Sequence, residues 1–231
     1  MGCLRAALAA AALALVLAAL PAAAGAQAPD PANFTTKIDN PYWPMRPGTR
    51  WVYREREDGR SQRNTVTVTR RTRTLQGVTT RVIHDIVTQG GRTVEDTLDY
   101  YAQDREGTIW YFGERTVEYS KGGKRSTEGS WEAGRHGASA GIALPADPQV
   151  GMTYRQEYRK GVAEDMGKVL SLDEQVEVPF GHWRRTLMTK DFTPLEPRQL
   201  EHKFYARGVG PVLTLAVSGS NGREELIRFR R

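Results

Sequence analysis

The sequence predicts an all-β protein, built as one strongly curved antiparallel sheet, or as a barrel or sandwich, of about ten strands. Segments with strict polar and apolar alternation, such as 65–69, recur along the chain and are separated by turns such as Asp58-Gly59. Residues 109–112 are apolar on both faces, which is typical of a central strand covered on both sides. Beyond residue 26, no twelve-residue stretch shows the spacing of an amphipathic helix.

The first 26 residues have the pattern of a secretory signal peptide. A short segment with one charge, Arg5, precedes an apolar run from Ala6 to Leu20, and small residues occupy positions 24 and 26. The run suits a signal peptide and is too short to span a bilayer comfortably. We therefore expect cleavage after Ala26, a secreted or periplasmic product, and no transmembrane anchor after cleavage.

The chain that remains should form one domain stabilised by its core alone. Its single cysteine, Cys3, lies before the predicted cleavage site, so the mature chain has no cysteine and no disulfide. Residues 27–37 are rich in proline and alanine and predict a flexible leader. Residues 38–231 then predict a single β-rich domain, with two pseudo-repeats at 48–113 and 151–217.

The charge balance narrows the choice of partners. The formal net charge of +6 falls to +5 on cleavage, because residues 1–26 contain one arginine and no acid. The arginines are spread along the chain, so we expect no nucleic-acid partner, and at most a weak attraction to an anionic envelope polymer. A small molecule, a glycan or a lipid is the partner class that a curved sheet suits, and the sequence does not predict an oligomeric state.

Motifs for metal or nucleophilic catalysis are absent from the sequence. The mature chain has four histidines, none in HxH, HxxxH or HExxH spacing, and no GxSxG motif. We therefore expect no metal site and no cofactor, and the sequence identifies no catalytic residue.

Aromatic residues interleaved with carboxylates mark a candidate ligand site. They concentrate in 95–132, around the glycine- and proline-rich segment 126–148 that predicts a lid, and in a proline-bounded aromatic pair at 42–43. The alternative is that the aromatics plug the core and the carboxylates pair with arginines. The candidate ligand-binding residues are Tyr42, Trp43, Trp110, Glu114, Glu128, Trp131, Glu157, Asp165, Glu201 and His202.

Three functions are compatible with these residues. The first is a secreted or periplasmic binding module that holds a lipid, a glycan or an envelope polymer on a curved sheet. The second is a carbohydrate-active hydrolase or lyase, in which two converging carboxylates act beside an aromatic platform; its candidates are Glu114, Glu128, Glu157, Asp165 and Glu201. The third is a structural protein of the envelope. Whether the protein is an enzyme is left open.

Several segments resemble a group of exported bacterial hypothetical proteins. They are 38–42, 51–53, 101–114, 128–134, 154–158 and 201–203. The resemblance implies a secreted β-rich domain and brings no assigned activity. More distantly, 205–212 is similar to the closing strand of envelope lipoproteins with a LolA-like curved sheet, although those proteins close their sheet over helices that this sequence does not predict.

Overall fold

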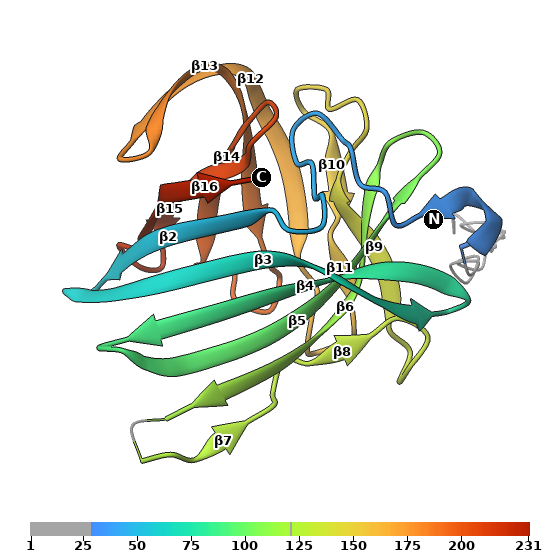
Figure 1. Ribbon diagram of the computed structural model, residues 1–231, viewed down its shortest axis with the longest axis horizontal. Coiled ribbons are helices and arrows are strands. Elements are labelled where there is room, and N and C mark those ends of the chain that lie inside the picture. The colour runs from blue at the N-terminus through green and yellow to red at the C-terminus, as the bar shows by residue number, and fades with distance from the viewer. Residues whose placement is uncertain (1–28, 121) are drawn as a thin grey trace, which may run out of the picture.

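The computed structural model describes residues 29–120 and 122–231, so the predicted signal peptide and its cleavage site lie outside the described residues. One antiparallel sheet of sixteen strands curves into a nearly closed barrel (Figure 1). The described residues contain no α-helix, which confirms the predicted all-β class with more strands than expected. None of their helical segments is long and apolar enough to cross a membrane.

Two five-stranded meanders form most of the barrel. The first comprises β2 (Arg50–Glu57), β3 (Arg60–Leu75), β4 (Val78–Gln89), β5 (Arg92–Asp104) and β6 (Ile109–Tyr119). The second comprises β12 (Met166–Val178), β13 (Gly181–Phe192), β14 (Leu200–Ala206), β15 (Gly210–Ser218) and β16 (Arg223–Arg230). Pairing of β16 with β2 joins the two meanders into one continuous surface.

Short elements complete and close the sheet. They are η1 (Pro31–Asn33), β1 (Phe34–Thr35), β7 (Arg125–Ser126), β8 (Trp131–Glu132), β9 (Ser139–Leu144), β10 (Thr153–Arg155) and β11 (Glu157–Tyr158). The strand order starts at β10 and ends at β11, and only Gln156 separates these two strands in sequence. A Cβ on Gly141 of β9 would lie 2.5 Å from the Gln156 carbonyl, so the close approach at this seam requires glycine.

A glycine that bonds to a neighbouring strand precedes β2 in the first half of the chain and β10 in the second half. The Gly48 amide donates to the Val68 carbonyl (2.8 Å) and the Gly151 amide donates to the Val169 carbonyl (2.9 Å), and both glycines have positive φ. The two contacts are alike, and the pseudo-repeats at 48–113 and 151–217 stay a prediction.

Two hydrophobic cores lie on opposite faces of the sheet. The inner core fills part of the barrel and includes Trp51, Ile109 and Leu187; the outer core lies on the other face and includes Tyr100 and Phe112. Ile109 and Phe112 are both fully buried, which confirms that residues 109–112 form a strand covered on both faces.

The proline-rich segment 39–48 covers one end of the barrel. The Asn40 side chain donates to the carbonyls of Gly107 (2.9 Å) and Pro145 (3.2 Å), which ties the segment to two loops. Trp43 packs between Tyr101 and Tyr205, with ring centroids 5.4 and 6.0 Å away. The segment therefore closes this end in the way that the plug interpretation predicts.

Two segments are more regular than the sequence suggests. Residues 126–148, predicted as a long lid, contain β8 and β9, and both pair with β6. Part of the predicted leader also pairs, because β1 lies against β5. In both segments the strands are short and flanked by glycine or proline, so their alternation is hard to recognise in the sequence.

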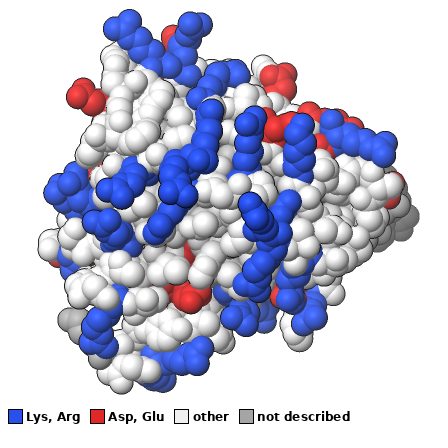
Figure 2. Space-filling model, viewed as in Figure 1, with Lys and Arg blue, Asp and Glu red and all other residues white. Residues whose placement is uncertain are grey.

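The outer face of the first meander is basic. Figure 2 shows lysine and arginine spread over the face formed by the first meander, with few carboxylates among them. One outward row crosses the sheet from Arg230 on β16 through Arg50 on β2 to Arg115 on β6. All three arginines are exposed.

Candidate functional site

A cavity of about 280 Å³ lies inside the barrel. Its aromatic lining consists of Trp43, Trp51, Tyr53, Tyr101, Tyr111 and Tyr205. Five carboxyl groups also line it: Asp85, Asp99, Glu157, Asp165 and Glu224. Lys203, Asn64, Gln156 and Thr214 supply the other polar groups, and a few aliphatic residues complete the wall. The lining therefore combines aromatic rings with an excess of acids.

Strand alternation places these acids inside. On β4, Asp85 shares a face with Ile83, and on β5, Asp99 shares a face with Tyr101. Glu224 faces inward from β16, where it precedes the outward-facing Glu225 that pairs with Arg54 at 2.9 Å. Alternation along β4, β5 and β16 thus points these three acids into the barrel.

A β-bulge on β6 brings Tyr111 and Glu114 to the same side of the sheet. Tyr101 pairs with Tyr111 and Asp99 pairs with Glu114, so the one residue between them on β5 lies opposite two residues of β6. Gly113 has φ +133° in this bulge, and a Cβ there would lie 2.3 Å from the Trp131 carbonyl oxygen. Glycine is therefore needed for the bulge, and the bulge is needed to point Glu114 inward.

The Tyr111 hydroxyl bridges two carboxyl groups. It lies 2.7 Å from Asp99 Oδ1 and 3.2 Å from Glu114 Oε2. A tyrosine has one proton to donate, so the second contact is a hydrogen bond only when that carboxyl is itself protonated. Burial, with repulsion between the two acids, raises the pKa of Asp99 well above its usual range. Burial raises the pKa of Glu114 to about 7.

Asn64 bridges a second pair of carboxyls. Its amide donates to Glu224 Oε1 (3.0 Å) and to Asp85 Oδ2 (3.4 Å). Burial, then repulsion from Glu95, raises the pKa of Asp85 to about 7; burial, then repulsion from Asp85, raises the pKa of Glu224 to about 8. The Oδ1 atoms of Asn64 and Asp85 are buried without a hydrogen-bond partner in the described part of the chain. Both are acceptors on residues that line the cavity.

Glu157 and Asp165 line the wall near the seam of the barrel. The Trp131 indole N–H donates to Glu157 Oε2 at 2.8 Å, and the Trp131 ring packs edge-on against Tyr111. Burial, followed by repulsion from Asp165 and Glu114, raises the pKa of Glu157 to about 8. Burial also raises the pKa of Asp165.

Lys203 is the one cation among the lining residues, and its charge is already balanced. Its ammonium lies 2.9 Å from Asp191 Oδ2 and 3.9 Å from Glu201 Oε2. Asp191 also accepts hydrogen bonds from the Thr189 hydroxyl (2.8 Å) and the Gln156 amide (3.2 Å). Attraction to Asp191 raises the pKa of Lys203 well above its usual range. The five lining carboxyls therefore have no free cation beside them in the lining.

Half of the residues that the sequence nominates come together here. Trp43, Glu157 and Asp165 line the cavity, and Glu114 and Trp131 bond to or pack against its lining. Glu201 lies on the rim, near Lys203.

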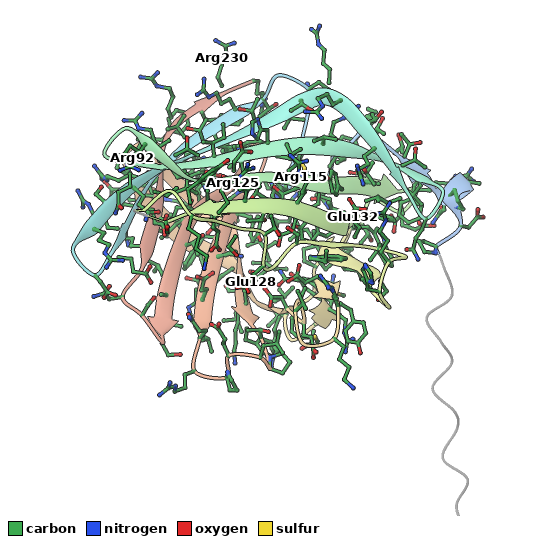
Figure 3. The ribbon with its side chains drawn as sticks, turned by 90° about the horizontal axis from the view of Figure 1, so that it is seen from below. Arg92, Arg115, Arg125, Glu128, Glu132 and Arg230 are labelled. Atoms are coloured by element: carbon green, nitrogen blue, oxygen red, sulfur yellow. The ribbon has the colours of Figure 1, made fainter. Side chains whose placement is uncertain are left out.

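The other nominated residues lie elsewhere. Tyr42 is buried at the closed end beneath the Arg207 guanidinium, 4.2 Å from the ring centroid. Trp110 faces the outer core and donates to Asp104 Oδ2 at 2.8 Å. His202 alternates with the inward-facing Lys203 on β14 and is not part of the lining. Glu128 is exposed on the connection after β7 (Figure 3).

The residues that the sequence did not nominate are Asp85, Asp99, Glu224 and Lys203, with the tyrosines beside them. A signal was present for Asp85, because it alternates with the apolar residues Ile83 and Val87 on one strand face. In the described residues, no group of three or more His, Cys, Asp or Glu side chains is placed to hold a metal ion.

Comparisons with known proteins give a limited result. No model of a known protein family matches the chain, and no curated protein matches it. A solved structure from Bacteroides fragilis, provisionally described as an exported protein with a YMCC-like fold, is similar over 82% of this chain and 99% of its own, with 14% identity and a TM-score of 0.49. A provisionally described lipoprotein from Parabacteroides distasonis covers 82% of this chain and 98% of its own, with 11% identity and a TM-score of 0.45.

Proposed function

We propose that this chain is an exported binding protein whose barrel holds a small polar ligand in the carboxyl-lined cavity. The observation that carries the proposal is the gathering of five carboxyl groups and six aromatic rings around one cavity, with Lys203 as the only lining cation in the described residues. A buried acceptor without a donor costs roughly 1–3 kcal/mol, and a ligand that supplies the donor recovers that energy. Donor-rich ligands therefore fit this wall.

The polar side chains that line the cavity favour some of the expected ligand classes over others. A lipid chain would place methylene groups against carboxyls and leave them without partners, which is unfavourable. A glycan fragment or another compact molecule with several O–H or N–H groups would pair with the carboxyls and pack its apolar faces on the tyrosines. The volume of about 280 Å³ suits a ligand of this size. An envelope polymer would enter only as one unit or end group.

A second candidate function is a carbohydrate-active enzyme. It is favoured by one observation, that Glu157 and Asp165 line the same cavity beside Tyr111 and the Trp131 that bonds Glu157. A carboxyl whose pKa is about 8 can hold a proton at neutral pH and act as a general acid. A binding protein and an enzyme can be separated by following the ligand after it binds.

The proposal is tested with mature protein, residues 27–231, by calorimetry against monosaccharides, amino sugars, linear amines and a fatty acid. We expect at least one donor-rich compound to bind and Thr214→Phe, which fills the cavity from β15, to weaken it about tenfold or more. Thr72→Phe, at an exposed position of β3, is the matched control. Circular dichroism verifies that both variants fold.

If no compound of the panel binds, or if the Thr214→Phe variant binds as tightly as the wild type, the cavity inside the barrel (its lumen) is not the binding site. Chromatography of oligosaccharides incubated with the protein separates the two functions. Cleaved products that disappear in Glu157→Gln would favour the enzyme, and unchanged ligand favours the binding protein.

A further inference from the structure

The cavity wall carries more acidic groups than basic ones, and a neutral ligand does not explain this excess. Five acids line the wall, and Glu114 reaches it through Tyr111. Around them, Glu55 faces inward from β2 and Glu95 from β5, and both lie near enough to raise the pKa of other inward carboxyls. The cation Lys203 is engaged by Asp191 and Glu201. The remaining ionisable groups on the wall are tyrosines, at positions 53, 101, 111 and 205.

The carboxyls fall into two pairs on different strands. Asp85 and Glu224 share the Asn64 amide, and Asp99 and Glu114 share the Tyr111 hydroxyl. Each pair has fewer donors than it has acceptor oxygens, because one amide or one hydroxyl serves two carboxyls. Two like charges this close would repel strongly if both ionised away from water. A positive group placed at each pair would remove that repulsion and supply the missing donors.

The aromatic rings add a second kind of attraction for positive charge. Trp43, Tyr101 and Tyr111 pack against one another along one wall, with Tyr101 and Tyr111 stacked at 4.7 Å between centroids. The face of an aromatic ring attracts ammonium and guanidinium groups, more strongly when water is excluded. Carboxyl pairs beside aromatic faces are the two surfaces that recognise organic cations, and both line this cavity.

We propose that the ligand is an organic polycation, a compact molecule with two or more ammonium or guanidinium groups, and that its binding displaces protons from the lumen carboxyls. This inference rests on the proposed function, since it names the class of ligand for the same cavity. The free protein keeps the carboxyls neutral with protons, because they would otherwise have to share a small volume as anions. The cation then replaces those protons, so each proton leaves to the solvent as one positive charge enters.

The outer face makes this binding selective for the lumen. Exposed arginines such as Arg50, Arg115 and Arg230 give the outer surface a positive field (Figure 2). A polycation is repelled from the face shown there and attracted to the carboxyls that gather inside the barrel. Non-specific adsorption of amines to the exterior is therefore unfavourable.

The experiment compares amines with neutral molecules of similar shape. The probes are spermidine and putrescine, with 1,4-butanediol as the neutral counterpart of putrescine, and succinate as an anion. Calorimetry is run with mature protein at pH 6, 7 and 8, and in phosphate and Tris, whose different ionisation enthalpies report the number of protons released.

We expect spermidine to bind most tightly, and its affinity to rise about tenfold per pH unit for each proton displaced. Asp85→Asn with Glu224→Gln should weaken spermidine binding about tenfold or more while leaving the cavity shape unchanged. Glu177→Gln, which removes an exposed carboxylate from β12, should leave the affinity unchanged. The inference is overturned if the diol binds as tightly as putrescine, if binding releases no protons, or if Glu177→Gln matters as much as the lumen pair.

The outcomes also separate this inference from the proposed function. Suppose that neutral sugars bind, that Thr214→Phe abolishes this binding, and that neither amine binds. The polycation proposal is then overturned, and the cavity remains a ligand site. Absence of binding by every probe in both panels would overturn both.

Discussion

Lys203→Met is expected to lower the free energy of unfolding by about 2–4 kcal/mol, because it leaves Asp191 without its cation. The ammonium lies 2.9 Å from Asp191 Oδ2, and the Asp191 side chain is only 8% exposed. The Lys203 side chain is 34% exposed, because it faces the lumen, so the expected loss is below that of a fully enclosed pair. Denaturant unfolding followed by tryptophan fluorescence measures the change.

The matched control is the double variant Lys203→Met with Asp191→Asn, which removes both charges. It should recover much of the stability, since the asparagine oxygen can accept from Gln156 while its amide donates to the Thr189 hydroxyl, so that both present contacts keep a partner. If the single and the double variants lose the same stability, the loss comes from packing and the ion pair does not matter.

Glu157→Gln combined with Glu224→Gln is expected to raise the melting temperature at pH 9 by roughly 5–10 °C and to leave it nearly unchanged at pH 4.5. The pKa of each carboxyl is raised from 4.5 to about 8 in the folded protein. Below pH 4.5 both carboxyls are protonated in the folded and the unfolded chain. Between pH 4.5 and 8 the unfolded chain ionises these carboxyls while the folded wild type keeps them protonated, so the wild type loses stability across this range. The loss is complete above pH 8, and the glutamine variant avoids it.

The substitutions preserve the hydrogen bonds that hold these side chains. In the variant, the Trp131 indole can donate to the new amide oxygen as it does to the Glu157 carboxyl, and Asn64 can do the same at position 224. Glu177→Gln, on the outside, serves as the control and should show no pH-dependent gain. A gain of equal size at pH 4.5 and pH 9 would mean that the glutamines act through packing and not through charge.

The fold class was predictable because it depends on local alternation. Turns such as Asp58-Gly59 and runs such as 65–69 mark strands wherever the two faces of the sheet differ in polarity. The closure of the barrel was not predictable. It depends on β10 and β11, the two ends of the strand order, which meet at Gln156, and on the close approach of Gly141 to the Gln156 carbonyl. Such contacts between separate strands leave no local pattern in the sequence.

The site was predictable only in part, for a related reason. Glu157 and Asp165 stand out as carboxylates near aromatic residues, and both line the cavity. Glu114 was among the nominated residues. Strict alternation would place it on the other face of the sheet from Tyr111, and only the bulge at Gly113 turns both side chains to the same face. Asp99 looked like an ordinary strand residue, because no pattern in one strand shows which distant carboxyl faces it across the barrel.

The lumen carboxyls are expected to hold protons at neutral pH until a donor-rich ligand takes their place. The most direct measurement is a pH titration of ¹³C-labelled carboxyl groups by NMR, with and without spermidine. We expect Glu157 and Glu224 to titrate near pH 8 in the free protein, and spermidine to move their inflections to lower pH. Titration of every carboxyl in the free protein below about pH 5.5 would contradict it, since that is the behaviour of carboxylates in contact with bulk water.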